Sequence, residues 1–210
     1  DKDPFQPLFG VKDVLKVLEQ FITISYRRDF FVADSIKCNF YNAGHILGSA
    51  IFEIWIGEGE GRIKIVAAGD LGSGIVSLLP PPAALDEGDY ILVESTYGPY
   101  RRRETDDRDF GNAVRQTLLA GGSVLIPAFT LDRTQKVLYA LGKLKKAGVI
   151  PAAVPVYMDS RTAQAIGQVY RRFRKEYHPD LKRHSANRAD PPLSFPGLRQ
   201  VRGSEALAAH

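Results

Sequence analysis

Three polar side chains in the first half of the chain each lie beside a segment with the composition of a β-strand. His45 lies in FYNAGHILGSA, Asp70 in IVAAGDLGS and Glu94 in YILVESTYG, at spacings of 25 residues (70−45) and 24 residues (94−70). An imidazole and a carboxylate are normal ligands of a hydrolytic zinc ion, which lowers the pKa of bound water to about 7. The pattern therefore predicts a fold that brings these three side chains to one edge of a sheet.

Each of these residues also has a more ordinary interpretation. His45, between Gly44 and Ile46, could be a core or turn residue. Asp70 after Gly69 is equally typical of a turn in which the Asp side chain hydrogen-bonds to nearby backbone. Neither residue alone identifies a metal site, so the prediction rests on the three segments together.

The segments AGHILGSA, GDLG and ESTYG, in this order and spacing, resemble the β-CASP family of nucleases with the metallo-β-lactamase fold. The downstream segments PAFTLDRTQKVLYAL and VYMDS extend the resemblance, which covers about residues 21–201. It implies an α/β chain: part of a metallo-β-lactamase αββα domain in residues 1–99, followed in residues 100–210 by a β-CASP domain with parallel βαβ units.

The resemblance also implies roles for individual residues. His45 corresponds to a metal ligand, and Asp70 corresponds to the ligand that bridges two zinc ions in the catalytic centre. Glu94 corresponds to an acidic residue that supports a catalytic histidine, here expected beyond residue 210. Thr96 and Tyr97, in the same segment as Glu94, are the expected substrate-binding residues.

Two features of the family pattern are absent from the sequence. The HxHxDH ligand cluster should precede His45, but no histidine occurs before that position, and the later histidine motifs do not appear before His210. The sequence also begins at Asp1 without Met. We therefore expect the chain to be an internal part of a longer protein, with two residues of a larger metal-ligand set. By itself it should bind zinc weakly and not cleave RNA.

Charge is distributed unevenly along the chain. Residues 1–98 carry 8 Lys and Arg against 14 Asp and Glu, a net charge of −6, whereas residues 99–210 carry 20 against 10, a net charge of +10. An acidic half suits a cation site and a basic half suits a polyanion such as RNA, although two ordinary solvated surfaces would give the same counts. The expected phosphate contacts are Arg101 to Arg103 and Arg133, the last because it lies at the start of a predicted helix, where free backbone donors favour anions. A structural ion pair is an equally good interpretation of Arg133. Other basic residues, Arg171, Arg172, Arg174 and Lys175, could be only solvated surface.

The single cysteine and the apolar segments bear on the compartment. Cys38 cannot form an internal disulfide and is expected in the core, which favours a reducing compartment: the cytoplasm, or the nucleus in a eukaryote. No apolar run approaches the ~18 residues of a membrane span, so no membrane partner is expected.

The apolar periodicity predicts a change of architecture near residue 100. Before it we expect a covering helix over 11–22, strands over 30–40, 50–56, 62–68 and 89–94, with Trp55 in the core, and a proline-rich loop over 78–82. After it we expect helices over 110–120, 130–147 and 160–177 and strands over 123–128 and 154–158, which is the βαβ alternation. A final loop over 178–196 would place His178 and His184 at the surface.

The leading functional hypothesis is zinc-dependent hydrolysis of RNA phosphodiester bonds, as in RNA processing or decay. The choice of RNA rests on the likeness of GHILGSA and ESTYG to the RNA-processing branch of the family, and it allows a homodimer or a processing complex. Two alternatives stay open: a non-catalytic RNA-binding paralogue, and a hydrolase of small esters or thioesters with the same fold.

Overall fold

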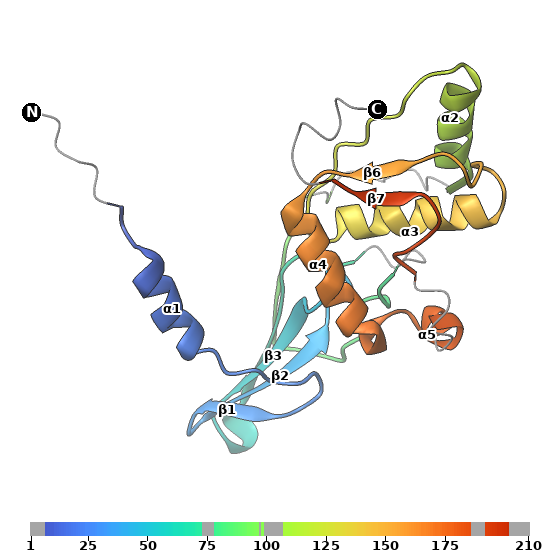
Figure 1. The fold of residues 1–210 in the computed structure, drawn as a ribbon. Helices are drawn as coiled ribbons and strands as arrows, with labels where there is room; N and C mark the ends of the chain where they lie inside the picture. Colours follow the sequence, from blue (N-terminus) through green and yellow to red (C-terminus); the bar gives the residue numbers. More distant parts are fainter. Residues whose placement is uncertain (1–6, 73–77, 97, 99–106, 186–191, 202–210) are drawn as a thin grey trace, which may run out of the picture.

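The computed structural model describes residues 7–72, 78–96, 98, 107–185 and 192–201 (Figure 1). In the first half, helix α1 (Val11–Glu19) precedes strands β1 (Phe30–Ala33), β2 (Ile36–Asn42), β3 (Ala50–Ile56), β4 (Ile63–Ala68) and β5 (Tyr90–Val93). In the second half the order is α2 (Asp107–Leu119), α3 (Arg133–Lys146), β6 (Val156–Met158), α4 (Arg161–Arg172), α5 (Pro179–Ser185) and β7 (Leu198–Gln200). The mixture of sheet and helices confirms the predicted α/β class.

The first half forms one five-stranded sheet in the order β1-β2-β3-β4-β5. The pairs from β1 to β4 are antiparallel, because short turns join them, whereas β5 pairs with β4 in parallel after the long connection over residues 69–89. The parallel register aligns Ala68 with Val93, and the antiparallel register aligns Ile51 with Ala68. The start of β3 and the ends of β4 and β5 therefore lie at the same edge of the sheet.

The two faces of this sheet differ in polarity, because side chains alternate along each strand. One face is apolar over most of β2, β3 and β4, and one of its registered rows is Cys38, Ile54 and Ile65. On the same face, Phe40 packs edge-on against both Phe30 and Phe52 at ring-centroid distances of 4.8 Å. Cys38 is buried there, as predicted. The opposite face mixes charge with aromatic rings, and its row Lys37, Trp55 and Lys64 crosses the same three strands.

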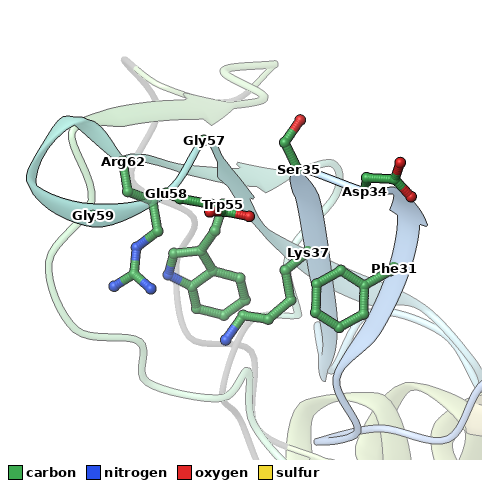
Figure 2. A pocket seen from close by; sticks show the side chains of 9 residues that line it. All are labelled: Phe31, Asp34, Ser35, Lys37, Trp55, Gly57, Glu58, Gly59 and Arg62. Atoms are coloured by element: carbon green, nitrogen blue, oxygen red, sulfur yellow. The ribbon is translucent and has the colours of Figure 1, made fainter.

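Trp55 is not a core residue, which corrects the expectation from sequence. Its ring is half-buried and lies under the Lys37 amine, which is 4.2 Å from the ring centroid. Figure 2 shows Lys37 between the rings of Phe31 and Trp55, at an open hollow of about 260 Å³. A tryptophan on the solvent face of a strand can bury its ring under the aliphatic stem of a lysine. The apolar composition of the strand therefore did not reveal on which face of the sheet Trp55 lies.

Two other predictions for the first half needed correction. The strand predicted over 30–40 is divided into β1 and β2 by a turn at Asp34 and Ser35, because polar turn-forming residues interrupt the apolar pattern. The helix predicted over 11–22 forms as α1, but it covers nothing among the described residues: every side chain in it is exposed, and it projects away from the sheet (Figure 1). Its periodicity is amphipathic, which predicts an apolar face but not the surface that the face contacts.

The main hydrophobic core lies in the second half. Side chains of α2, α3 and α4 pack around Tyr170, Tyr177 and Ile150, and the first half contributes Leu78 and Leu79 from the proline-rich loop. Helix α4 begins where Ser160 accepts a hydrogen bond from the Ala163 amide at 3.1 Å, which is a normal N-cap. None of the described helices is long and apolar enough to cross a membrane.

The second half contains one parallel βαβ unit, in which β6 and β7 are paired in parallel and α4 lies between them in sequence; the pattern predicted β6 but not β7. The strand predicted over 123–128 is absent, because Pro127 lacks a backbone donor and Val124 and Leu125 are exposed without a pairing strand. The helix predicted over 160–177 ends at Arg172 and is followed by a short 3-10 turn. The loop predicted over 178–196 contains α5, which includes His184, a residue whose side chain lies outside those described.

We predict that Leu78 links the stability of the two halves. Its side chain is 0% exposed within the core cluster, so Leu78→Ala should lower the free energy of unfolding by about 2–5 kcal/mol through lost burial and a residual cavity. Urea unfolding measures this change. Leu119→Ala, at a position 76% exposed in α2, is the control and should change it by less than about 0.5 kcal/mol. Equal effects of the two substitutions would contradict the packing.

Candidate functional site

His45, Asp70 and Glu94 come from three segments that meet at one edge of the sheet. His45 lies in the loop between β2 and β3, Asp70 follows the end of β4 by two residues, and Glu94 directly follows β5. The parallel register of β4 and β5 makes their C-terminal ends coincide, and β3 starts beside the end of β4. The topology therefore brings together the three side chains that the sequence analysis singled out.

The loop over residues 43–49 is held by its own polar groups. The Asn42 side chain accepts a hydrogen bond from the Gly44 amide at 2.7 Å, which is the usual Asx turn. The Ser49 hydroxyl accepts hydrogen bonds from the amides of His45 and Ile46, each at 3.2 Å. These contacts fix the backbone on both sides of the histidine, which is why Asn, Gly and Ser flank it.

Two glycines let the loop approach its neighbours closely: Gly44 makes room for the proline-rich loop, and Gly72 makes room for the contact between the Asp70 segment and the His45 loop. Gly44 has φ +64°, and a Cβ atom there would lie 2.7 Å from the Pro80 carbonyl oxygen. The Gly72 amide donates to the Ala43 carbonyl at 2.9 Å, and a Cβ atom on Gly72 would overlap the carbonyl of Gly44. Only residues without side chains fit this contact, and it places the residue after Gly44 beside the segment that carries Asp70.

The His45 and Asp70 side chains are in contact. His45 Nε2 lies 3.3 Å from Asp70 Oδ2, and the two side chains are 40% and 64% exposed. This distance suits an ion pair when the imidazole is protonated. It also suits two ligands of one zinc ion, because ligand bonds of about 2.1 Å at tetrahedral angles separate the donor atoms by about 3.4 Å. Within the described part of the chain no third His, Cys, Asp or Glu side chain joins them in a metal-binding group.

Glu94 is held near this pair by Thr96. The Thr96 amide donates to Glu94 Oε2 at 2.8 Å, and hydrogen bonds from the Thr96 side chain and backbone, followed by the nearby His45, hold the pKa of Glu94 below its usual value. Glu94 therefore stays ionised at neutral pH, which a carboxylate that orients a histidine requires. The observed role of Thr96 is to bind Glu94, and its role in substrate binding stays a prediction.

The other predicted contacts are only partly described. Arg133 is exposed at the first residue of α3, and Lys136, one turn later, donates to the His45 carbonyl at 3.4 Å, so the start of α3 lies beside the site. Tyr97 and Arg101 to Arg103 lie outside the described residues. His178 was predicted at the surface, but its side chain is only 19% exposed. Its amide donates to the Leu78 carbonyl at 2.8 Å.

Three polar residues beside the His45 loop were missed by the sequence analysis. They are Asp132, Lys136 and Tyr170, from the start of α3 and from α4. Lys136 and Tyr170 contact the backbone of His45 and Leu47, and Asp132 contacts both of these side chains. The available signal was the position of Asp132 near the start of the helix predicted over 130–147, where a capping side chain is usual. Here the carboxylate is instead directed to Tyr170 and Lys136.

Comparisons with known proteins agree with this arrangement. Residues 134–209 match the family model described as "Beta-Casp domain". The chain is 32% identical over 185 residues to an RNase J-like protein of Methanocaldococcus jannaschii, a match covering 86% of this chain and 42% of the relative. It is 32% identical over 206 residues to ribonuclease TTHA0252 of Thermus thermophilus, covering 97% of this chain and 46% of the relative. A transcription termination factor FttA of Pyrococcus abyssi is 35% identical over 164 residues, covering 76% of this chain and 25% of that protein.

These findings define the class of protein. A sheet whose edge gathers a histidine and an aspartate, followed by a helical part with a parallel βαβ unit, is an α/β arrangement of the metallo-β-lactamase type that continues into a β-CASP domain. Residues 134–209 are similar to the β-CASP domain, and most of the chain is similar to the RNase J-like protein and the ribonuclease named above. The chain spans 42% and 46% of the length of these two relatives.

We predict that the Gly72 contact is required for the site. Gly72→Ala should lower the free energy of unfolding by about 1–3 kcal/mol, because the added methyl group overlaps the Gly44 carbonyl, and should shift the imidazole resonances of His45. Gly69→Ala is the matched control, since a Cβ atom at Gly69 meets nothing within 4 Å. Urea unfolding and NMR measure the two effects, and an unchanged His45 spectrum in Gly72→Ala would contradict this prediction.

Proposed function

We propose that the protein hydrolyses RNA phosphodiester bonds in a zinc-dependent reaction. The observation that carries the proposal is the 3.3 Å contact between His45 Nε2 and Asp70 Oδ2 at a sheet edge of a β-CASP chain. Relatives of similar sequence are named ribonuclease and RNase J-like protein, which supports RNA as the substrate class.

The residues present fit part of a two-zinc centre. His45 would supply an imidazole ligand, and Asp70, with two carboxylate oxygens and a largely exposed side chain, would supply a bridging ligand. When bound, zinc would provide an activated water nucleophile and positive charge beside the scissile phosphate. Glu94, kept ionised by Thr96, would orient a protonated histidine that serves as general acid toward the leaving oxygen.

The basic second half supports binding of a polyanion beside this edge. It carries a net charge of +10 over residues 99–210, and the start of α3 lies close enough to His45 for Lys136 to reach its carbonyl. Arg133 precedes Lys136 by three residues, so the two share one side of the helix. The exposed guanidinium of Arg133 would contact a phosphate of the RNA strand as that strand enters the site.

The two alternative functions make different predictions. A non-catalytic RNA-binding paralogue would bind RNA without cleaving it, whereas a hydrolase of small esters or thioesters would not need the basic half. The names of the relatives favour neither alternative. An assay that measures RNA binding and RNA cleavage on the same full-length preparation separates all three functions.

We predict that His45→Ala and Asp70→Asn in the full-length protein each reduce the rate of RNA cleavage about 100-fold or more. Loss of an outer-shell partner of a metal ligand already costs about 10–100-fold, so loss of a ligand should cost at least the upper value. Cleavage of an end-labelled single-stranded RNA measures the rate, and zinc content is measured in parallel. Asp86→Asn, at an exposed carboxylate elsewhere, is the control and should match the parent.

Two results would contradict this assignment. Cleavage by His45→Ala at the parent rate would remove His45 from the site. Cleavage by the parent that persists after zinc is removed with a chelator would remove the metal from the reaction. An intact protein that binds RNA but never cleaves it, with zinc present, would favour the non-catalytic alternative.

We predict that Arg133 contributes one phosphate contact. Arg133→Gln should weaken binding to all single-stranded RNAs alike and reduce the slope of log affinity against log salt by about 0.7, the value for one phosphate on a single strand. Arg172→Gln, at an exposed arginine two residues after the buried Tyr170 and so on the opposite side of α4, should leave the slope unchanged. Fluorescence anisotropy at several salt concentrations measures both slopes. Equal slopes for the parent and Arg133→Gln would mean that the phosphates follow another path.

A further inference from the structure

A closed ring of hydrogen bonds connects the His45 loop with the helices of the second half. Lys136 Nζ donates to the His45 carbonyl at 3.4 Å and forms an ion pair with the carboxylate of Asp132. The Tyr170 hydroxyl donates to Asp132 Oδ1 at 3.0 Å and accepts from the Leu47 amide at 3.3 Å. The ring begins and ends on the same loop, on either side of Ile46, and its side chains come from α4 and the start of α3.

Two of the three side chains in this ring are buried. Tyr170 is 1% exposed and Asp132 is 7% exposed, so neither can exchange its partners for bulk water. Removing one partner would leave a buried polar group unsatisfied, which costs more than the net value of an ordinary hydrogen bond. The ring is therefore held as a unit, and the loop backbone is held with it.

The backbone of Asp132 is unusual as well. Its φ is +65°, a conformation that non-glycine residues adopt infrequently, and it directly precedes the first residue of α3. Its side chain makes no cap hydrogen bond to the helix. The carboxylate is thus directed away from the helix end that it would normally cap and toward Tyr170 and Lys136, so local helix stability does not account for it.

We propose that Asp132, Lys136 and Tyr170 are positioning residues that hold the backbone of His45 and Leu47 and thereby set the orientation of the His45 imidazole toward Asp70. The predicted effects on zinc affinity and RNA cleavage rest on the proposed function, whereas the predicted effect on the loop backbone does not. A metal ligand must be held within a fraction of an ångström of its working position, and its supporting contacts make that possible. Here the support comes from residues up to 123 positions away in sequence.

The chain offers a matched pair of variants for the test. Tyr170→Phe removes the hydroxyl group that joins the Leu47 amide to Asp132. Tyr177→Phe removes a hydroxyl from a residue in the same core cluster that is 0% exposed, and that hydroxyl donates to the Tyr170 carbonyl at 2.9 Å rather than to the loop. Tyr170→Phe loses two hydrogen bonds, one to Asp132 and one from Leu47, whereas Tyr177→Phe loses one, and only the first variant loses a bond to the loop.

The primary measurement is amide hydrogen exchange, followed by mass spectrometry, over residues 43–49 of the full-length protein without added metal. We expect exchange at Leu47 to become roughly tenfold faster in Tyr170→Phe, because one hydrogen bond to that amide is lost, and to stay at the parent value in Tyr177→Phe. Lys136→Met, at a partly exposed residue, should also loosen the loop. Equal exchange over residues 43–49 in Tyr170→Phe and Tyr177→Phe would overturn the proposal.

Zinc affinity and RNA cleavage give the second measurement. In Tyr170→Phe and Lys136→Met, zinc affinity, measured by competition with a chelator, should fall about 10-fold, and kcat should fall while KM for RNA is retained. Tyr177→Phe should match the parent in both quantities. If no preparation cleaves RNA but the exchange difference is found, the proposed function fails and the positioning role stands. If the parent cleaves RNA and the exchange difference is absent, the positioning role alone fails.

Discussion

The double pairing of β4 is the constraint on which the rest of the site depends. By pairing antiparallel with β3 and parallel with β5, this strand places the loop before β3, the turn after β4 and the end of β5 at one sheet edge. The Gly72 amide then bonds to the Ala43 carbonyl at 2.9 Å, and the absence of a side chain on Gly72 permits the close contact. His45 and Asp70 are in contact because the backbone places their side chains next to each other at this edge.

The fold could be predicted where local pattern determines the structure. The strands β3, β4 and β5 and the helices α2, α3 and α4 formed close to their predicted positions, since alternation or helical periodicity extends over each of them. The errors occurred where the structure of a segment depends on contacts with residues distant in sequence. Residues 123–128 have a strand composition, but Pro127 and the lack of a pairing strand among the described residues leave them without regular structure. Helix α1 has an apolar face, yet no described residue covers it.

The candidate site shows the same division. His45, Asp70 and Glu94 could be found from sequence because each adjoins a strand end, and a resemblance to a known family gave them their expected roles. Asp132, Lys136 and Tyr170 could not, because their contacts with the loop and with one another span 38 to 123 residues, apart from one pair a helical turn apart. Polar residues on helices are usually solvated, so nothing in their local sequence indicated that they enclose the loop that carries His45.

The central claim is that His45 and Asp70 are ligands of the same metal centre, held there by the sheet edge and the loop contacts. X-ray diffraction from crystals of the full-length protein grown with zinc, recorded on both sides of the zinc absorption edge, tests it most directly. The account predicts an anomalous peak about 2.0–2.2 Å from both His45 Nε2 and an oxygen of Asp70. A zinc ion bound elsewhere, with His45 and Asp70 still paired to each other at 3.3 Å, would contradict it.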